Sequence, residues 1–304
     1  MGDAAVNRAD EPAPLLTVAM PVYNAGKDLR LAVLSIIAQT FRDWELLLID
    51  DGSTDNAVQD IKSIGDARIR IIRDGKNRGL AARLNEAIDM ARGRYFARMD
   101  QDDVSYPTRF ERQLELLSED STLDVVAVQG ITISDNDEIS GLMPCPVTNS
   151  QISARPWQGF CFPHPTWMGH IEWFKKHRYA QPGPYFCEDQ ELMLRSYRQS
   201  RFAAVDEILF AYRVREVSHL QKVLKTRWTF LKIQMRYFCS FAFFHYVFLA
   251  CMVAIALIGR DIWWRMKRMM NRRERPVQVI EAREREHWRQ VYAQIVQNAE
   301  STVA

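Results

Sequence analysis

The sequence lacks several features that would assign it to a class at once. Its five cysteines have neither paired nor zinc-type spacing, which favours reduced thiols and a cytosolic catalytic domain. The net charge is only +2 over 304 residues, so composition gives no case for nucleic acid as a partner. No period of 20–50 residues repeats along the chain.

Two nucleotide-binding motifs are also missing. No G-x-G-x-x-G follows the first predicted strand, which disfavours a dinucleotide oxidoreductase, and no G-x-x-x-x-G-K-[ST] occurs anywhere. Any phosphates must therefore be held by a metal ion and basic side chains. Residues 1–14 are polar without an apolar core, so we expect a disordered lead-in and not a signal peptide.

Strand and helix patterns alternate in the first hundred residues. Short apolar runs predict strands, the first of which breaks at Pro21, and helical spacing of apolar residues predicts the segments between them. The strands are expected at 15–20, 44–49, 69–72 and 95–99, and the helices at 28–39, 58–64 and 77–90. This order predicts parallel βαβ units, hence an α/β fold with a Rossmann-like, mostly parallel central sheet. A helix at 109–117, a strand at 124–133 and a turn at 135–141 are expected next.

Three of the four strands end in polar clusters, at Tyr23-Asn24, Asp50-Asp51 and Asp100-Gln101-Asp102. In a doubly wound sheet such clusters meet along one edge. The strand that begins at Tyr95 runs directly into three carboxylates, which repel one another unless a cation lies among them. Mg²⁺ or Mn²⁺ commonly bridges such carboxylates to substrate phosphates, which suggests a metal–diphosphate site. The alternative is a solvated acidic turn that caps the helix starting near Pro107.

The successive motifs between about residues 15 and 218 resemble those of family 2 glycosyltransferases with the GT-A fold, of the bacterial surface-polysaccharide type. Each motif alone is weak, but their order and spacing together are specific. The motifs are Pro21-Val22-Tyr23-Asn24, Ile49-Asp50-Asp51-Gly52-Ser53-Thr54-Asp55, Asn77-x-Gly79 with Arg83 and Asn85, Asp100-Gln101-Asp102-Asp103, His164-Pro165-Thr166, Glu188-Asp189-Gln190-Glu191-Leu192 and Tyr212-Arg213.

The resemblance implies a nucleotide-sugar donor, most often a UDP-sugar. Asp51 is then expected to contact the base, Asp100 to face the ribose, and Asp102 to bind the Mn²⁺ or Mg²⁺ that bridges the diphosphate. The metal would stabilise the charge of the leaving diphosphate. The other donor-site residues carried over are Pro21, Tyr23, Asn24, Arg83 and Arg213. In one place the sequence departs from the family, which often has His where this chain has Arg215.

The resemblance also implies the residues that act on the acceptor. Asp189, with Glu188 beside it, is expected to take the proton of the acceptor hydroxyl. Direct displacement with a single base would invert the anomeric configuration. His164 and Trp157 are candidates for the acceptor side, since aromatic faces suit stacking on sugars, although both residue types are more often structural in such a loop.

The C-terminal third has a different composition. Apolar residues from Leu220 onwards lie on one helical stripe with lysines and arginines off it, which suits either an anionic membrane surface or packing on the catalytic domain. Residues 238–259 are almost wholly apolar and, as a helix of about 33 Å, could cross a membrane. Both flanks are basic, so the segment either spans with unusual flanks or re-enters. A charged helix at 281–298 could contact a partner or the membrane.

These observations predict a catalytic domain at 15–217 and a helical, membrane-associating region at 218–304. The expected function is an inverting, metal-dependent glycosyltransferase at the cytoplasmic face of the membrane, with a glycan acceptor that is lipid-linked. Two alternatives remain. One is a nucleotidyltransferase that forms sugar nucleotides, and the other is a membrane protein that binds nucleotide sugars without turnover.

Overall fold

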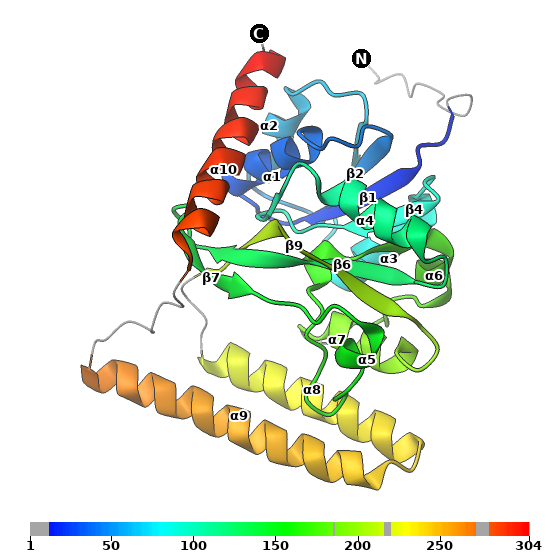
Figure 1. Cartoon of the computed structure of the whole chain (residues 1–304), viewed down its shortest axis with the longest axis vertical. Coiled ribbons are helices and arrows are strands. Elements are labelled where there is room, and N and C mark those ends of the chain that lie inside the picture. The colour runs from blue at the N-terminus through cyan, green and yellow to red at the C-terminus, as the bar shows by residue number, and fades with distance from the viewer. Residues whose placement is uncertain (1–11, 185, 216–219, 272–279, 304) are drawn as a thin grey trace.

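The computed structural model describes residues 12–184, 186–215, 220–271 and 280–303. Most of the predicted lead-in at 1–14 therefore lies outside the described residues. The described chain folds around one nine-stranded sheet in the order β3-β2-β1-β4-β8-β6-β9-β5, with β7 paired to β6. Helices cover both faces of this sheet, and a pair of long helices lies beyond one side of it (Figure 1).

The first half of the sheet has the predicted parallel βαβ order. All pairings among its four strands, β2–β3, β1–β2 and β1–β4, are parallel. The predicted break at Pro21 is wrong, because Pro21 pairs with Ile49 inside β1. The elements are β1 (Leu16–Val22), α1 (Asp28–Ile37), β2 (Trp44–Asp50), α2 (Ala57–Lys62), β3 (Ile69–Arg73), α3 (Leu80–Met90) and β4 (Tyr95–Arg98).

The second half of the sheet is mixed. β9 runs parallel to β6, whereas β8 pairs antiparallel with both β4 and β6. The predicted turn at 135–141 is shorter, because β7 already begins at Ile139. The elements are β5 (Val104–Ser105), α4 (Arg109–Glu119), β6 (Val125–Ile133), β7 (Ile139–Met143), α5 (Asn149–Ile152), the 3₁₀ helix η2 (His164–Thr166), β8 (Met168–His170), α6 (Ile171–Lys176), α7 (Glu188–Ser196) and β9 (Phe202–Arg213).

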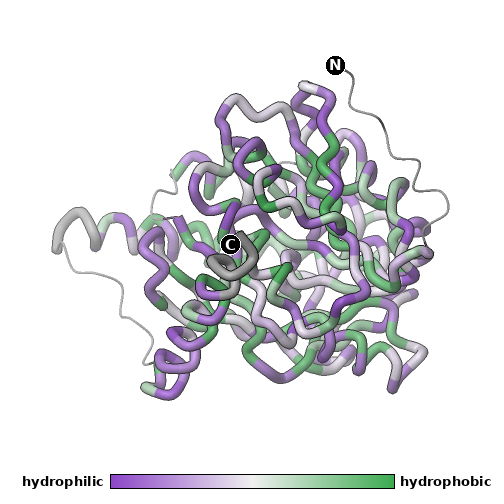
Figure 2. The backbone as a smooth tube through the Cα atoms, turned by 90° about the horizontal axis from the view of Figure 1, so that it is seen from above, coloured by the Kyte–Doolittle hydropathy of each residue, from purple (hydrophilic) through white to green (hydrophobic). Residues whose placement is uncertain are grey.

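Alternate residues of the strands enter two hydrophobic cores, one on each face of the sheet. Val18 of β1 packs with α1, α2 and α4 on one face, and Ala19 packs with α3, α6 and α7 on the other. Hydrophobic and hydrophilic stretches are interspersed along the backbone (Figure 2). The predicted α/β class is thus confirmed.

The predicted apolar helix at 238–259 is two helices. α8 (Leu220–Ser240) ends in a tight turn at Ala242, whose φ is +56°, and α9 (Phe244–Asn271) starts after it. The two helices pack side by side as a hairpin (Figure 1), with Arg227 of α8 paired to Asp261 of α9 at 3.3 Å. A non-glycine residue in the left-handed region reverses the chain here, which the apolar composition did not indicate.

The predicted helix at 281–298 forms as α10 (Ala282–Val303), and it packs on the domain that contains the sheet. It runs along α1 on the side of the molecule away from the α8–α9 hairpin (Figure 1). Trp288, Val291 and Ile295 are buried in the same core as α1 and α4. Their spacing of three and four residues places them on one helical face.

Candidate active site

The polar clusters at the ends of β1, β2 and β4 meet at one edge of the sheet, as predicted. The amide of Gln101 pairs in both directions with the main chain of Tyr23, accepting from its N–H at 2.7 Å and donating to its C=O at 3.1 Å. Asn24, with φ +47°, accepts from the N–H of Thr54 at 2.8 Å. These bonds hold the ends of β1, β2 and β4 together. Pro21 is the last but one residue of β1, and the side chain of Tyr23 is exposed.

Asp51 is buried and holds the loop before α3. One carboxylate oxygen accepts from the N–H of Arg78 and from Nε of Arg83, and the other accepts from the N–H of Gly79 at 2.9 Å. Gly52 permits the close approach, because a Cβ there would lie 3.0 Å from the carbonyl carbon of Lys76 and φ is +78°. Asp51 and Arg83 therefore form one charged cluster beneath this edge.

Asp100 forms a bidentate pair with Arg98, two residues before it on β4. Arg98 is 2% exposed, and both of its terminal nitrogens donate to the Asp100 carboxylate. Burial acts to lower the pKa of Arg98, but the nearby negative charges of Asp100, Glu188 and Asp103 outweigh it and raise that pKa. Arg98 thus remains a buried cation among the acidic residues of the site.

Asp102 lies beside Arg215. Its Oδ2 accepts from Nη2 of Arg215 at 3.0 Å and from Nε at 3.3 Å. Burial and repulsion from Asp100 nevertheless raise the pKa of Asp102. Asp103 is fully buried, its Oδ1 accepts from the N–H of Arg213 at 2.8 Å, and its Oδ2 has no partner among the described residues. The three carboxylates are therefore crowded, which favours a cation among them.

The donor set of this turn fits a divalent ion shared with a substrate. Among the described residues, no group of three or more Asp, Glu, His or Cys side chains is arranged to enclose a metal. Mg²⁺ and Mn²⁺ sites that bind phosphates need fewer protein ligands, commonly one or two carboxylates. Asp100 and Asp102 would supply that number.

The acidic pair Glu188 and Asp189 begins α7, as predicted, and both residues are half-buried. Burial is the main cause that raises the pKa of each carboxyl, and the charge of Asp189 raises the pKa of Glu188 further. Asp189 Oδ2 accepts from the side-chain amide of Gln190 at 3.1 Å. The positive charge of Arg98 acts in the opposite direction and lowers the pKa of both carboxyls. The fold therefore brings the start of α7 and the end of β4 to one site.

The two candidates for the acceptor side have structural partners. His164 is buried, its Nε2 lies 2.7 Å from the hydroxyl of Tyr179, and burial together with Arg98 holds its pKa well below the usual value. The lowered pKa favours the neutral imidazole, in which one ring nitrogen donates a hydrogen bond and the other accepts one. Trp157 stacks on Tyr246 of α9 at a centroid distance of 4.8 Å, so it joins the hairpin to the domain.

Arg213 is buried and directs its guanidinium at the protein. Nε donates to the carbonyl of Asp102 at 2.9 Å, Nη1 to the carbonyl of Ser134 at 2.8 Å, and Nη2 to Asp137 at 2.6 Å. Sequence reasoning did not single out Arg98, Tyr179 or Asp137 for the site. Only Arg98 gave a signal, because an arginine inside a predicted buried strand requires a charged partner nearby.

Comparison with known proteins gives a consistent result. Residues 17–178, more than half of the chain, match the model of Glycosyl transferase family 2. The chain is 33% identical over 103 residues to the Escherichia coli protein "UDP-Glc:alpha-D-GlcNAc-diphosphoundecaprenol beta-1,3-glucosyltransferase WfgD", covering 34% of this chain and 41% of WfgD. It spans between 32% and 47% of the length of several other curated relatives.

Two solved structures share the fold. One is S. aureus TarS 1-349 in complex with UDP-GlcNAc, with a TM-score of 0.58, 16% identity, and coverage of 95% of this chain and 82% of that chain. The other is the mannosyltransferase PcManGT from Pyrobaculum calidifontis in complex with GDP-Man and Mn²⁺, with a TM-score of 0.57, 14% identity, and coverage of 96% and 88%.

Proposed function

Because the chain belongs to glycosyl transferase family 2, we propose that it transfers a sugar from a nucleotide-sugar donor to a hydroxyl of a glycan acceptor, with inversion at the anomeric carbon. The observation that carries this proposal is the meeting of two acidic groups around Arg98. Asp100, at the end of β4, accepts hydrogen bonds from both terminal nitrogens of Arg98, and the charge of Arg98 also acts on Glu188 and Asp189 at the start of α7.

The donor side is the edge formed by Asp51, Asp100 and Asp102. Asp102, with Asp100 nearby, would hold a divalent ion, which would supply charge stabilisation to the leaving diphosphate. Of the two solved structures that share the fold, one is a complex with UDP-GlcNAc and the other a complex with GDP-Man and Mn²⁺, which supports a nucleotide sugar and a divalent ion. We favour a UDP-sugar, as for the relative WfgD.

Asp189 is the proposed base, with Glu188 beside it. Its raised pKa makes the carboxylate a better proton acceptor than an ordinary aspartate, which suits removal of the proton from an acceptor hydroxyl. Attack by that hydroxyl breaks the bond between the anomeric carbon and the diphosphate. One displacement without a covalent intermediate gives the inverted product.

The acceptor that we propose is a lipid-linked glycan in surface-polysaccharide synthesis, because the name of WfgD specifies a diphosphoundecaprenol-linked sugar. The α8–α9 hairpin offers the matching membrane surface. Within the described residues, Phe244–Lys267 is the one helical stretch long and apolar enough to cross a membrane, and little of it is buried. Composition and length alone do not separate a span from an in-plane helix.

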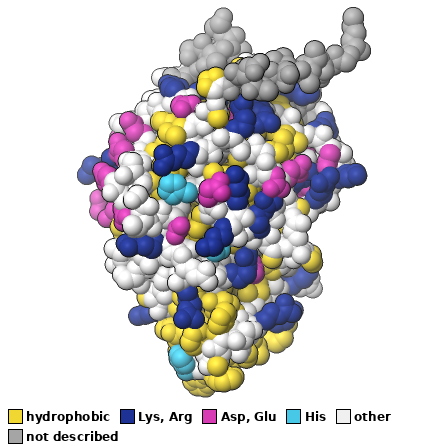
Figure 3. All heavy atoms as spheres, turned by 90° about the vertical axis from the view of Figure 1, so that its right-hand side faces the viewer, with side chains coloured by type: hydrophobic (Ala, Val, Ile, Leu, Met, Phe, Trp, Pro, Cys, Tyr) yellow, Lys and Arg dark blue, Asp and Glu magenta, His cyan; other side chains and the backbone are white. Residues whose placement is uncertain are grey.

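We propose that α9 lies in the plane of the membrane at its cytoplasmic face, and the packing of the hairpin supports the in-plane orientation. α8 is fixed to the domain, since Gln234 donates to the carbonyls of Pro156 and Trp157, and α9 packs along α8. The outer face of α9 carries a stripe of exposed apolar side chains, and hydrophobic side chains gather at this end of the molecule with lysine and arginine around them (Figure 3). The stripe is Phe244, Phe248, Met252, Ile255, Ile262 and Met266.

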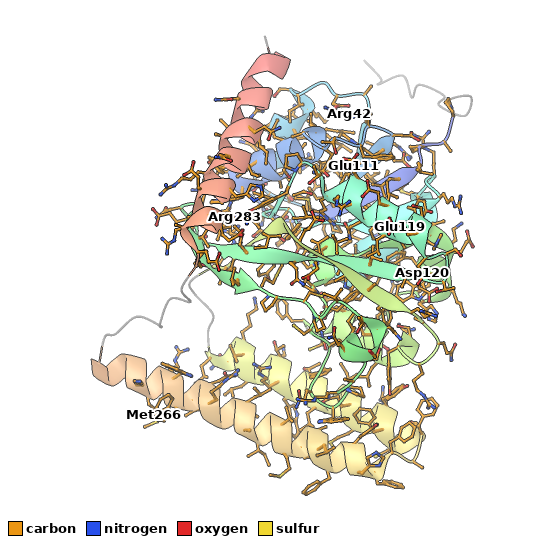
Figure 4. The ribbon with its side chains drawn as sticks, viewed as in Figure 1. Arg42, Glu111, Glu119, Asp120, Met266 and Arg283 are labelled. Carbon is orange, nitrogen blue, oxygen red and sulfur yellow. The ribbon has the colours of Figure 1, made fainter. Side chains whose placement is uncertain are left out.

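Basic residues at the end of α9 complement anionic lipid headgroups. Lys267 lies 5.0 Å above the rings of Trp263 and Trp264, and Met266 projects from α9 away from the sheet (Figure 4). An apolar stripe with aromatic and basic residues at its border is typical of helices that lie in the headgroup region. This arrangement would hold the catalytic domain beside lipid-linked acceptors and raise their effective concentration.

A panel experiment tests the proposed reaction. The purified full chain is incubated with Mn²⁺ and each of several UDP- and GDP-sugars, and release of the nucleoside diphosphate is measured with and without lipid-linked acceptors. Transfer of sugar from one donor, absent in Asp102→Asn, supports the proposal. Pyrophosphate release from a nucleoside triphosphate and a sugar phosphate would instead identify a nucleotidyltransferase, and donor binding without any turnover would identify a binding protein.

A further inference from the structure

The last helix reaches the turn between β6 and β7 through two polar contacts. Trp288 and Tyr292 lie one helical turn apart on the face of α10 that meets this turn. Trp288 Nε1 donates to the carbonyl of Asp137 at 2.8 Å, and the Tyr292 hydroxyl donates to Asp137 Oδ2 at 3.1 Å. α10 therefore fixes both the main chain and the carboxylate of one residue.

Asp137 adopts a left-handed backbone conformation in this turn. Its φ is +61°, in the left-handed region that a non-glycine residue enters at a cost in energy. The turn is closed by the N–H of Asp137, which donates to the carbonyl of Ser134 at 3.1 Å. With Tyr292 on Oδ2, the other oxygen, Oδ1, is directed to Arg213 Nη2 at 2.6 Å.

Arg213 connects Asp137 to the turn that contains Asp100, Asp102 and Asp103. It holds the carbonyl of Asp102 through Nε at 2.9 Å and the carboxylate of Asp103 through its backbone N–H at 2.8 Å. A continuous path of direct contacts therefore leads from Tyr292 through Asp137 and Arg213 to Asp102. Each bond of this path has the Asp137 carboxylate or the Arg213 guanidinium as a partner, so each is charge-assisted. Charge-assisted hydrogen bonds are stronger than neutral ones.

We propose that α10 is a positioning element for the donor site, in which Tyr292 and Trp288 set the place of Asp137 and, through Arg213, the main chain of Asp102. The proposal rests on the proposed function in one respect, since Asp102 is taken as the residue that meets the donor's metal–diphosphate group. It assigns a role to α10 that differs from contact with a partner or a membrane.

The apolar contacts that hold α10 in place and its polar contacts with Asp137 can be removed by separate substitutions. Val291 and Ile295 are buried against the core and hold the helix in place, whereas the polar atoms of Trp288 and Tyr292 act on Asp137. Ile295→Val removes one buried methyl group and touches none of the polar path. Tyr292→Phe removes one hydroxyl and keeps the ring, which packs edge-on against Trp288 at 5.6 Å.

The test uses the full chain and UDP with MnCl₂ as the probe, with affinity measured by calorimetry. We expect Tyr292→Phe to weaken UDP–Mn²⁺ binding by about three- to ten-fold, the effect of one hydrogen bond. Ile295→Val should lower Tm but leave the affinity unchanged. In an Asp137→Ala background, Tyr292→Phe should have little further effect on affinity, because the two residues act in series.

Hydrogen exchange of the backbone amide of Arg213, measured without nucleotide, provides a readout that does not depend on the donor. We expect it to be faster in Tyr292→Phe than in wild type and unchanged in Ile295→Val. The proposal is overturned if Tyr292→Phe matches wild type in both measurements, or if Ile295→Val weakens UDP binding as much as Tyr292→Phe does. If wild type binds neither UDP nor GDP, the proposed donor class fails, while the exchange comparison still decides the role of α10.

Discussion

Arg215 bridges Asp102 and Asp28, with its Nη2 3.0 Å from a carboxylate oxygen of each. The guanidinium is about half exposed, so it can leave this position without opening the fold. It occupies one carboxylate oxygen of Asp102, the residue proposed to hold a divalent ion. A divalent ion that binds Asp102 would therefore compete with Arg215 for this carboxylate.

This competition predicts the effect of Arg215→Gln. Mn²⁺ binding without nucleotide should become tighter by about two- to five-fold, the scale of an exposed ion pair that no longer has to be broken. Electron paramagnetic resonance of free Mn²⁺ at pH 8 measures this directly. Arg112→Gln is the matched control, because it removes an exposed ion pair with Glu207 elsewhere on the surface and should leave Mn²⁺ affinity unchanged. Weaker Mn²⁺ binding in Arg215→Gln would contradict the competition.

Asp102→Asn should abolish metal-dependent nucleotide binding while the protein stays folded. The substitution keeps the shape of the side chain but removes the charge that a divalent ion requires. The measurement is UDP affinity with and without Mn²⁺, with Tm as a check on folding. Unchanged affinity in the presence of Mn²⁺ would show that Asp102 is not the metal ligand.

Asp189→Asn should leave donor affinity nearly intact and reduce turnover by about 10²-fold or more, the usual scale for loss of a general base. Since burial raises the pKa of Asp189, the acid limb of the wild-type kcat profile should lie above the ordinary aspartate value of 3.8, and activity should fall as pH drops through it. The comparison variant is Glu188→Gln. If that variant is inactive and Asp189→Asn turns over normally, the base is Glu188.

The carboxylate positions were predictable, because strand periodicity followed by polar residues locates the carboxyl ends of β1, β2 and β4. The residues from distant parts of the chain that pair with side chains of this site were not predictable. Asp28 meets Arg215 and Asp137 meets Tyr292 through tertiary packing, and neither pair leaves a pattern in the sequence. The reversal at Ala242 was also hidden, since apolar residues continue on both sides of it and a left-handed residue needs no glycine or proline to mark it.

Glu45 gives a prediction about stability and pH. Burial acts to raise its pKa, but hydrogen bonds from Thr17, Arg92 and Arg70 outweigh burial and hold the pKa below the ordinary 4.5. A lowered pKa contributes stability above the unfolded value that is lost as pH falls through the folded value. Glu45→Gln should therefore reduce the free energy of unfolding by about 1–3 kcal/mol at pH 7. The difference from wild type should shrink below about pH 4.5, as urea titrations at several pH values would measure.

Because α10 packs on the domain that contains the sheet, the α8–α9 hairpin should be deleted without α10. Truncation after Val217 deletes Trp288, Val291 and Ile295 from the core, and each such side chain contributes about 1.5–3 kcal/mol when buried. We expect that truncation to have a markedly lower Tm than wild type. Replacing residues 220–271 with a flexible linker keeps α10 and should give a protein that binds UDP–Mn²⁺ but no longer floats with anionic vesicles. Equal Tm for the two deletions would contradict the docking of α10.

The hairpin formed by α8 and α9 leaves the catalytic domain after β9, and α10 brings the chain back to that domain. It is therefore an insertion held at both ends and not a tail. An insertion can be exchanged as a cassette, because its two attachment points remain fixed whatever lies between them. On the proposed membrane role of the hairpin, grafting hairpins of different apolar width or charge between the same two points would change which membrane surface the protein binds and leave the proposed donor site unaltered.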